Sequence, residues 1–259
     1  MTDFIKFIGR KLLSFGKIRN NICYLRAFYF CKIKKDMKNF NKVSDETWKN
    51  TLDSNKRIVF NKNINLPKKP KRFSVFDIGR SLAGGSTNLL MKAIKKKYNK
   101  SELKNLKVLS IGPRAEGEIF NIFSHGFELK NITGLDLFSY SPLIKLGDMH
   151  NLEFNDEEFD VVLMGWCLAY SNDKKKALLE AKRVMSKNGL LVIGYSVNKK
   201  TTDQDQINQR GYLIRSPYNQ INNMENLNDL ANSIDLKMFY SKIISTTPPA
   251  EKLIYGATK

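Results

Sequence analysis

The sequence predicts an α/β protein with a doubly wound, mostly parallel sheet, a terminal antiparallel hairpin and a basic helical N-terminal extension. Two observations predict this class. From about residue 106, short apolar strands alternate with amphipathic helices, a pattern typical of a parallel sheet covered on both faces. Near the C-terminus, two apolar stretches flank Pro248-Pro249, which indicates two strands joined by a short turn.

The elements follow in order along the chain. Strands are predicted at 107–111, 132–137, 160–166 and 190–195, and hairpin strands at 236–244 and 252–257. Helices are predicted at 115–126, 171–189 and 224–234. We expect Ser171 or Asn172 to cap the second helix and Asn188-Gly189 to close it.

The composition fits one large domain with an extension. Of the 259 residues, 42% are hydrophobic and 27% charged, which excludes wholesale disorder. The basic residues crowd the first part of the chain, which ends in the proline-containing run 67–72. We therefore divide the chain into an N-terminal extension, 1–72, and a domain, 73–259. The domain has a core over 106–197, a loop and helix over 198–235 and the hairpin over 236–259.

The net charge of +19, from 44 basic and 25 acidic residues, has two interpretations. A basic surface can bind nucleic acid or anionic lipid. Alternatively, abundant lysine, asparagine and isoleucine reflect an AT-rich genome, and the sequence favours this interpretation. Nucleic-acid sites prefer arginine forks and aromatic platforms to dispersed lysine, so nucleic acid is the less favoured partner.

The sequence also bears on location. Three scattered cysteines do not form a disulfide scaffold, and no window reaches the roughly 18–20 apolar residues that span a bilayer. We therefore expect a cytoplasmic protein. Residues 4–15 form an apolar helix face opposite a basic one. This pattern fits peripheral contact of residues 1–35 with an anionic membrane, or packing of the helix on the main domain.

A candidate ligand site lies where the predicted parallel strands end. In open parallel sheets, ligands bind beyond the carboxyl ends of the strands. Gly112 follows the first strand and permits a tight turn before a helix start. Asp136 ends the second strand, where a carboxylate can accept both hydroxyls of a ribose. Asp148 follows the apolar run 143–146 and can accept from an adenine amino group, while Met149 offers the ring an apolar face.

In order and spacing, these segments resemble the class I S-adenosylmethionine-dependent methyltransferases, in the branch of small, type 11-like methyltransferase domains. The matching segments are 108–118, 134–136, 147–150, 159–162 and 183–191. The resemblance implies a Rossmann-like, seven-stranded sheet whose last strand is antiparallel, and S-adenosylmethionine as the cofactor. It also implies that the cofactor contacts Gly112, Arg114, Glu116, Gly117, Asp136, Leu137, Asp148, Met149 and Trp166.

The sequence departs from the family pattern in two places. Ser110 stands where the family usually has an acid, so Glu116 or Glu118 is a hypothetical replacement that grips the cofactor's amino group. The stretch between Asp136 and Asp148 is too short for the usual helix. We expect residues 139–142 to form a loop on the cofactor side instead.

Two residues are candidates for catalysis. His150 can deprotonate an acceptor hydroxyl, or it can be a hydrogen-bonded structural histidine. Tyr170, with Trp166, follows the strand at 160–166, where the family binds the methyl acceptor; both can equally be core or rim aromatics. Two isolated histidines and separated cysteines give no recognised metal-ligand spacing, so no metal is expected.

The favoured hypothesis is methyl transfer to a hydroxyl, amine or carboxyl of a small-molecule or glycan-type acceptor. An alternative is a non-catalytic or RNA-associated binding module that retains the fold. A nicotinamide dehydrogenase ranks last, because the Gly-x-Gly-x-x-Gly spacing that it requires is absent.

Overall fold

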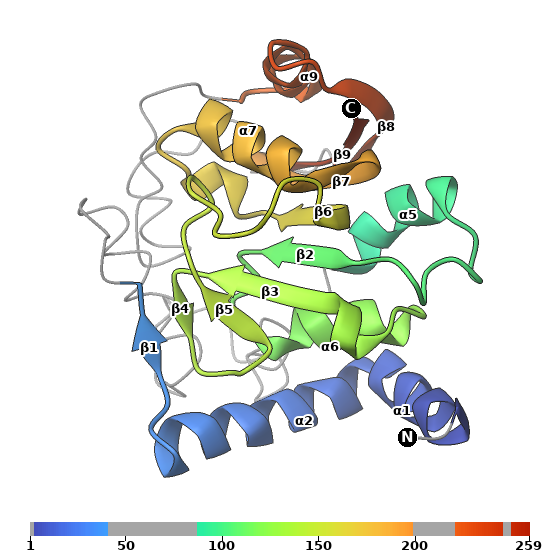
Figure 1. The fold of residues 1–259 in the computed structure, drawn as a ribbon, viewed down its shortest axis with the longest axis vertical. Coiled ribbons are helices and arrows are strands. Elements are labelled where there is room, and N and C mark those ends of the chain that lie inside the picture. Colours follow the sequence, from blue (N-terminus) through green and yellow to red (C-terminus); the bar gives the residue numbers. More distant parts are fainter. Residues whose placement is uncertain (1–2, 41–86, 199–220, 246–249) are drawn as a thin grey trace.

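The computed structural model describes residues 3–40, 87–198, 221–245 and 250–259. Its main feature is a seven-stranded sheet in the order β5-β3-β2-β6-β7-β9-β8, drawn in Figure 1. The strands are β2 (Val108–Ile111), β3 (Ile132–Asp136), β5 (Ile144–Leu146), β6 (Phe159–Gly165), β7 (Met185–Asn198), β8 (Lys237–Ser245) and β9 (Ala250–Thr258). The run at 67–72 and the turn at Pro248-Pro249 lie outside the described residues.

The strand directions confirm the predicted doubly wound sheet with a terminal hairpin. The pairs β5–β3, β3–β2, β2–β6 and β6–β7 are parallel, and β9 is antiparallel to both of its neighbours. The antiparallel strand is not the edge of the sheet, because β9 inserts between β7 and β8. The last strand of the chain therefore lies inside the sheet, where it is paired on both sides.

Helices cover both faces of the sheet, and β6 shows why. Its residues Val161 and Leu163 pack with α5 (Thr87–Lys97) and α6 (Glu116–Ser124). The alternate residues Val162 and Met164 pack with α7 (Lys174–Val184) and α9 (Met224–Asn232) on the opposite face. A continuous apolar run is thus buried on both sides, as its sequence indicates.

The predicted ends of the helix at 171–189 were wrong. Asp173 caps α7 and accepts a hydrogen bond from the Lys176 amide at 2.9 Å. The helix stops at Val184, because Met185 turns to extended backbone and pairs with Phe159 in the sheet. Asn188-Gly189 belongs to β7, at a shift in its register with β6. Tertiary strand pairing overrides the local stop signal.

No helix separates β3 from β5, which confirms the expected loop. Its first residues form the short strand β4 (Phe138–Ser139), which pairs with β1 (Lys38–Asn39) of the N-terminal extension. The amide of Phe40 also donates to the Leu137 carbonyl at 2.6 Å. The extension therefore reaches the edge of the sheet at which β3 ends.

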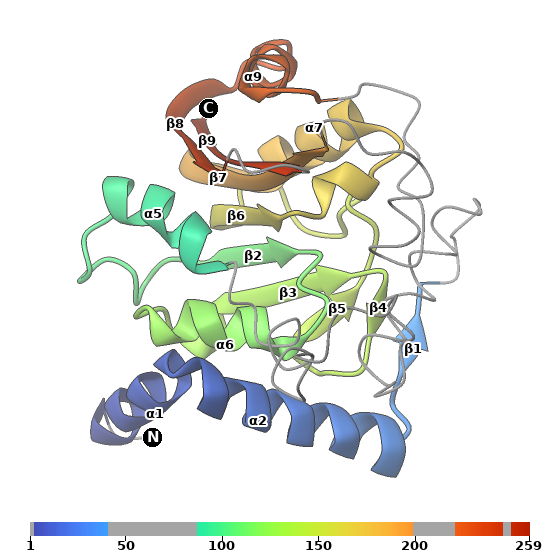
Figure 2. The ribbon, with the colours of Figure 1, turned by 180° about the vertical axis from the view of Figure 1, so that it is seen from behind.

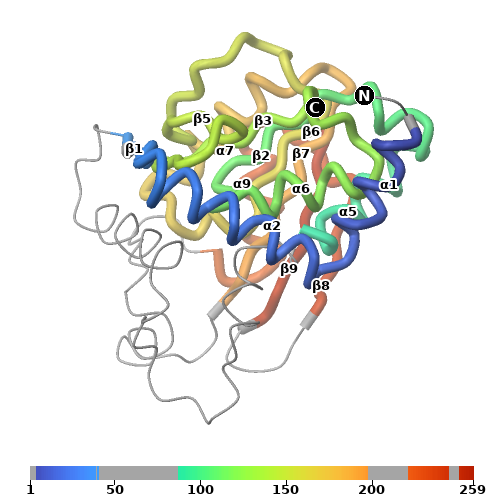
Figure 3. The backbone as a smooth tube through the Cα atoms, turned by 90° about the horizontal axis from the view of Figure 1, so that it is seen from below, coloured from blue at the N-terminus to red at the C-terminus, as the bar shows by residue number. Residues whose placement is uncertain are grey.

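The extension begins with two helices, α1 (Asp3–Ser14) and α2 (Gly16–Phe28), and α2 continues as a π-turn, η1 (Tyr29–Ile33). Figures 1 and 3 show both helices lying across α6 as an outer layer. On α1, Lys6 and Arg10 both pair with Glu128, at 2.8 and 2.7 Å. Packing on the main domain, one of the two interpretations of this segment, is thus observed. None of the described helices is long and apolar enough to cross a bilayer.

Candidate functional site

The sequence-predicted site residues gather at one edge of the sheet. Gly112, Asp136, Asp148 and Trp166 follow β2, β3, β5 and β6, which run parallel. Figure 2 shows the arrowheads of β2 and β3 pointing to the side on which β4 and β1 lie. This is the edge at which open parallel sheets bind ligands.

Gly112 makes the turn after β2. Its φ is +70°, and its amide donates to the Leu135 carbonyl at 2.8 Å. A Cβ on Gly112 would lie 2.5 Å from the Cβ of Cys167, so a side chain fits here neither sterically nor conformationally. The Cys167 thiol contacts the Ile111 carbonyl at 3.1 Å. The loops after β2 and β6 are therefore pressed together at this glycine.

Asp136 is joined to the same turn. Its carboxylate accepts from the Arg114 amide at 2.9 Å and from the Phe138 amide at 3.5 Å, and Arg114 has a φ of +56°. Burial raises the pKa of Asp136 to about 6, although the hydrogen bond from Arg114 opposes the shift. A buried carboxylate whose hydrogen-bonding capacity is only partly used is suited to accept from a polar ligand.

Glu118 lies beside Ser110, the residue that stands where the family usually has an acid. Its Oε1 accepts from the Ser110 hydroxyl at 2.5 Å. A Cβ on Gly165, at the end of β6, would lie 3.2 Å from the other carboxylate oxygen. The carboxylate thus lies between the ends of β2 and β6. Burial raises the pKa of Glu118 to about 7, although the bond from Ser110 opposes the shift.

Glu116 is engaged by the extension and by the loop after β4. Arg26 of α2 donates to its two carboxylate oxygens at 2.5 and 2.8 Å. The Ser141 hydroxyl donates to Oε1, and the Glu116 amide donates to the Tyr140 hydroxyl at 3.2 Å. The Glu116 side chain is fully buried. Its carboxylate therefore joins three segments of the chain rather than facing the turn at Gly112.

An apolar cluster supports the same junction. Ala27 of the extension packs with Ala115, Phe138 and Tyr140, and Phe30 and Met37 border them. The cluster joins the residue before α6 to the strand after Asp136. The extension thus packs against the loops that follow β2 and β3, which carry the predicted cofactor contacts Gly112 and Asp136.

Asp148 is oriented by a buried hydrogen-bond chain. Its Oδ1 accepts from the His150 amide at 2.9 Å and contacts His150 Nδ1 at 2.6 Å. His150 Nε2 lies 2.7 Å from the hydroxyl of Ser171, which is fully buried. Burial alone would raise the pKa of Asp148, but the bonds from His150 hold it below its usual value. Because ionised Asp148 can only accept, Nδ1 of His150 carries a proton and donates to it.

Trp166 directly follows β6 and has a φ of +64°, which is uncommon for a bulky residue. Its amide donates to the Gly194 carbonyl at 2.8 Å, and its ring leaves no room for a Cβ at Gly194. Within the described residues, its buried indole Nε1 has no hydrogen-bond partner. Tyr170 lies half-buried at the end of the short helix η3 (Leu168–Tyr170). Both aromatic residues thus lie in the segment after β6, as predicted.

The remaining predicted contacts have less distinctive surroundings. Gly117 is buried in the first turn of α6, Leu137 is half-buried and Met149 is 7% exposed. Burial raises the pKa of Cys167 well above its usual value, as do the nearby acids Glu118 and Asp136. Cys167 is thus an uncharged packing residue. In the described part of the chain, no three His, Cys, Asp or Glu side chains gather closely enough to hold a metal ion.

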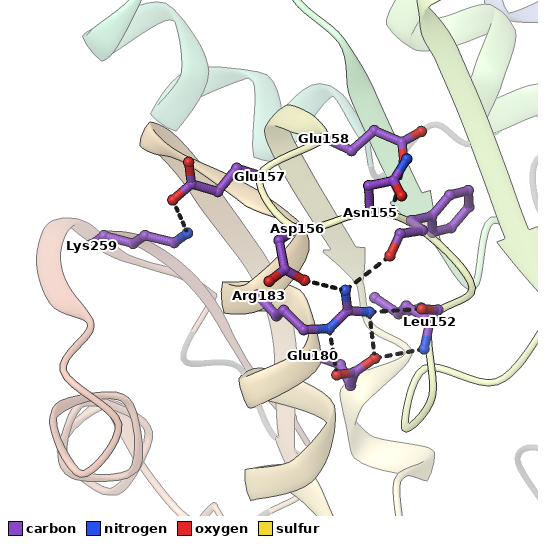
Figure 4. Close-up of polar contacts among 9 residues, drawn as sticks. Leu152, Asn155, Asp156, Glu157, Glu158, Glu180, Arg183 and Lys259 are labelled. Atoms are coloured by element: carbon purple, nitrogen blue, oxygen red, sulfur yellow. Dashed lines mark hydrogen bonds and ion pairs between the residues drawn. The ribbon is translucent and has the colours of Figure 1, made fainter.

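Arg183 of α7 fixes the segment that connects Asp148 to β6 (Figure 4). It donates to the carbonyls of Leu152 and Phe154 at 2.7 and 2.9 Å, and to Asp156 at 2.7 Å. Glu180 binds its guanidinium at 2.9 Å and accepts from the Leu152 amide at 2.7 Å. Lys259 pairs with Glu157 at 3.7 Å and attaches the C-terminus to the same segment. These contacts fix the chain that follows His150.

Sequence reasoning missed the hydrogen-bond partners that organise this site. Arg26 and Glu116 lie 90 residues apart, and no local spacing relates them. Ser110 and Glu118 carried a usable signal, since a serine at an acid position suggests that another acid lies nearby. Ser171 was read as a helix cap, although it binds His150.

Comparisons with known proteins agree with this architecture. Residues 112–193 match the family model described as a methyltransferase domain. No curated protein sequence matches the chain. Among solved structures, the CurJ carbon methyltransferase superposes with a TM-score of 0.50 at 14% identity, over 67% of this chain and 54% of that chain. This chain thus spans about half the length of that protein, and at such identity the likeness shows the fold alone.

Two further structures resemble the chain less closely by TM-score. Phosphoethanolamine N-methyltransferase 2 of Haemonchus contortus gives a TM-score of 0.49 at 14% identity, over 66% of this chain and 52% of that chain. A protein of Pyrococcus horikoshii OT3 gives 0.48 at 18% identity, over 69% and 90%. The family match begins at Gly112, includes Asp136 and Asp148 and ends in β7, so it covers the carboxyl edge of the sheet. Residues 112–193 thus resemble a methyltransferase domain, and the chain shares the fold of the CurJ carbon methyltransferase.

Proposed function

We propose that this protein transfers a methyl group from S-adenosylmethionine to a hydroxyl, amine or carboxyl of a small-molecule or glycan-type acceptor. The observation that carries the proposal is that one glycine turn and three carboxylates lie at the same edge of the sheet. The turn is at Gly112, where a side chain does not fit, and the carboxylates are those of Glu118, Asp136 and Asp148. All four lie within the region that matches the methyltransferase family.

The nucleoside part of the cofactor is assigned to the two aspartates. Asp136 is assigned to the ribose hydroxyls, because its buried carboxylate ends β3 and can accept more hydrogen bonds than those from the Arg114 and Phe138 amides. Asp148 is assigned to the adenine amino group, with Met149 and Leu137 as the apolar neighbours of the ring. The His150–Ser171 chain holds the Asp148 carboxylate in one orientation. Prearranged acceptors lose little side-chain entropy on binding.

The amino group of the cofactor's methionine part is assigned to Glu118. Of the two acids at the start of α6, Glu116 already holds a cation, Arg26, and the Ser141 hydroxyl. The hydrogen-bond partner of Glu118 at the strand ends is the neutral Ser110 hydroxyl, and the hydroxyl of Thr87, which also lowers its pKa, is neutral as well. A ligand ammonium would stabilise the ionised form of this buried carboxylate. Gly112, Arg114 and Gly117 would then contact the cofactor through the backbone of the turn and the first turn of α6.

The methyl acceptor is assigned to the side of Trp166 and Tyr170. When bound, S-adenosylmethionine supplies an electrophilic methyl group on a sulfonium. The protein then contributes alignment and exclusion of water, without a covalent intermediate. The indole N–H of Trp166 supplies a donor that has no partner among the described residues. Tyr170 is the proposed acid–base group, and His150, with both ring nitrogens bonded, is a positioning residue for Asp148.

The free thiols fit a cytoplasmic location for this activity. Cys23, Cys31 and Cys167 form no disulfide with one another. Burial raises the pKa of the first two to about 12, so these thiols stay protonated at neutral pH. A reducing compartment is the usual environment of such thiols.

The proposal is tested by acceptor-dependent formation of S-adenosylhomocysteine. Pools of hydroxyl, amine, carboxyl and oligosaccharide compounds are incubated with the protein and S-adenosylmethionine, and the product is quantified by mass spectrometry. Turnover with at least one pool, lost in Asp136→Ala and kept in Asp229→Ala on the exposed side of α9, supports methyl transfer. Cofactor binding without turnover of any pool, or turnover that Asp136→Ala leaves unchanged, would contradict the proposed reaction or its site.

A further inference from the structure

The two N-terminal helices expose their apolar side rather than burying it. Along α1, the positions that face the domain follow a helical stripe of Lys6, Gly9, Arg10 and Leu13. Two of these four residues, Lys6 and Arg10, are charged, and both pair with Glu128. On α2, Arg26 points inward to Glu116 of the domain, and Arg19 donates to the Leu13 carbonyl of α1. Charged side chains of both helices therefore take part in docking on the domain.

The outward side carries large apolar residues. Seven of them on α1, α2, η1 and the turn between the helices are each 50–70% exposed: Phe4, Ile5, Phe7, Phe15, Leu25, Phe28 and Ile33. Amphipathic helices of a globular domain normally bury such residues against the core and expose the charged ones. A run of exposed aromatic and aliphatic side chains on consecutive helices marks an interaction surface rather than scattered surface apolar residues.

Lysines border this apolar surface. Exposed lysines on the same segment are Lys11, Lys17, Lys32, Lys34, Lys35 and Lys38. Between residues 4 and 40 the sequence has one acidic residue, Asp36. Two of the lysines lie against aromatic rings: Lys11 over Phe7 at 5.7 Å and Lys34 over Tyr29 at 5.7 Å. Long basic side chains beside aromatic ones are suited to the boundary between acyl chains and anionic headgroups.

We propose that the outward face of α1, α2 and η1, defined by these seven apolar residues and their flanking lysines, binds the surface of an anionic lipid bilayer. The helices form an outer layer over α6, as Figure 3 shows. Exposed apolar residues with exposed lysines among them match a charged, deformable surface. The inward Arg26, Arg10 and Lys6 keep these helices attached to the domain, so membrane contact needs no unfolding of the site.

The test is cosedimentation of the full chain with lipid vesicles. We expect binding to vesicles of mixed phosphatidylglycerol and phosphatidylcholine, and much weaker binding to phosphatidylcholine alone. The triple variant Phe4→Ser/Phe7→Ser/Phe15→Ser should bind the anionic vesicles at least about tenfold more weakly. The matched control Leu179→Ser/Met238→Ser/Ile243→Ser replaces three other exposed apolar residues and should bind like the wild type.

The charge contribution has its own pair of variants. Lys32→Glu/Lys34→Glu/Lys35→Glu should weaken binding to anionic vesicles about tenfold or more, and added salt should have the same effect. Lys95→Glu/Lys96→Glu/Lys100→Glu makes the same change in net charge on and just after α5 and should have a much smaller effect. The inference does not depend on methyl transfer, and neither measurement requires activity.

Three results would overturn the proposal. The first is a wild type that anionic vesicles do not retain. The second is a serine triple variant that they retain as well as the wild type. In the third, the wild type self-associates, the serine triple variant is monomeric and neither binds vesicles, which would assign the surface to a second copy of the chain. Circular dichroism of each variant verifies that it is folded.

Discussion

Arg26 of α2 holds the fully buried carboxylate of Glu116 with two hydrogen bonds, at 2.5 and 2.8 Å. The guanidinium also lies over the rings of Phe30 and Phe120, at 5.2 and 5.6 Å. Glu116 begins α6, directly after the turn that carries Gly112 and Arg114. An extension that precedes the domain in sequence is therefore a structural part of the candidate cofactor site.

Removing this cation should destabilise the fold. Arg26→Ala leaves a carboxylate buried without its charged partner, which should lower the free energy of unfolding by about 3 kcal/mol. Glu116→Gln in the Arg26→Ala background removes the buried charge and should restore part of the loss. Lys11→Ala, at an exposed position of α1, is the control. Urea unfolding gives the free energy of unfolding of the wild type and of the three variants. An Arg26→Ala variant as stable as the control would show that the pair contributes no net stability.

Gly112 should tolerate no side chain. Gly112→Ala places a Cβ 2.5 Å from that of Cys167 and strains a backbone with a φ of +70°. We expect a loss of about 2 kcal/mol in stability and at least tenfold weaker cofactor binding. Gly9→Ala, within α1, meets nothing within 4 Å and should leave binding unchanged.

A second variant separates collision from strain at Gly112. In a Cys167→Gly background the Cβ contact is gone, so Gly112→Ala should cost less there than in the wild type. Equal costs in the two backgrounds, measured by urea unfolding, would mean that the collision does not occur.

Glu118 should make the stability depend on pH. Its pKa is about 7 in the folded protein against a reference value of 4.5, so the folded state retains a proton that the unfolded chain releases. This contribution is fully present below pH 4.5 and is lost as the pH rises through 7. The loss amounts to at most about 3 kcal/mol. Glu118→Gln should flatten the pH dependence of the urea midpoint over this window, whereas Glu102→Gln, at an exposed position, should leave it.

Cofactor binding should reverse this protonation. If the ligand ammonium pairs with Glu118, the carboxylate loses its proton on binding. Calorimetric titration at about pH 6, in buffers of different ionisation enthalpy, should then show net proton release by the wild type. Glu118→Gln should release less. Equal proton release by the two proteins would remove Glu118 from its proposed role.

Arg183 should be needed to order the segment before β6. Arg183→Ala removes bonds to two carbonyls and two carboxylates, so we expect a loss of about 2–4 kcal/mol in stability. Arg183→Lys keeps the charge but not the planar fork, and should recover less than half of that loss. Hydrogen exchange of amides 149–158 should quicken in both variants. Unchanged exchange there would mean that other contacts fix the segment.

The sheet was predictable from sequence because its signal is local. Apolar runs, strand–helix alternation and turn residues fall within short windows of the sequence. The continuous apolar run of β6 indicates directly that both of its faces are buried. The predicted helix boundaries were wrong where strand pairing between residues distant in sequence outweighs local helix signals. Met185 leaves the helix because Phe159 offers it a strand partner. The hairpin was visible, but the insertion of β9 between β7 and β8 was not, since strand order is set by packing.

The candidate site was predictable in its positions but not in its partners. Strand-end residues such as Asp136 and Asp148 follow from topology. The hydrogen bonds that orient them depend on side chains remote in sequence, as with Ser171 and His150. Glu116 and Glu118 are both buried but differ in their partners, since Glu116 pairs with Arg26 whereas Glu118 has no paired cation among the contacts described above and has a pKa of about 7. The sequence shows only two nearby acids of the same type.

The central claim is that the edge formed by Gly112, Glu118, Asp136 and Asp148 binds S-adenosylmethionine. Isothermal titration of the wild type with S-adenosylmethionine and S-adenosylhomocysteine tests it most directly, alongside Asp136→Ala and the exposed control Asp229→Ala. We predict micromolar binding by the wild type and the control, and at least tenfold weaker binding by Asp136→Ala. A folded wild-type protein that binds neither compound, or an Asp136→Ala variant that binds as tightly as the control, would contradict it.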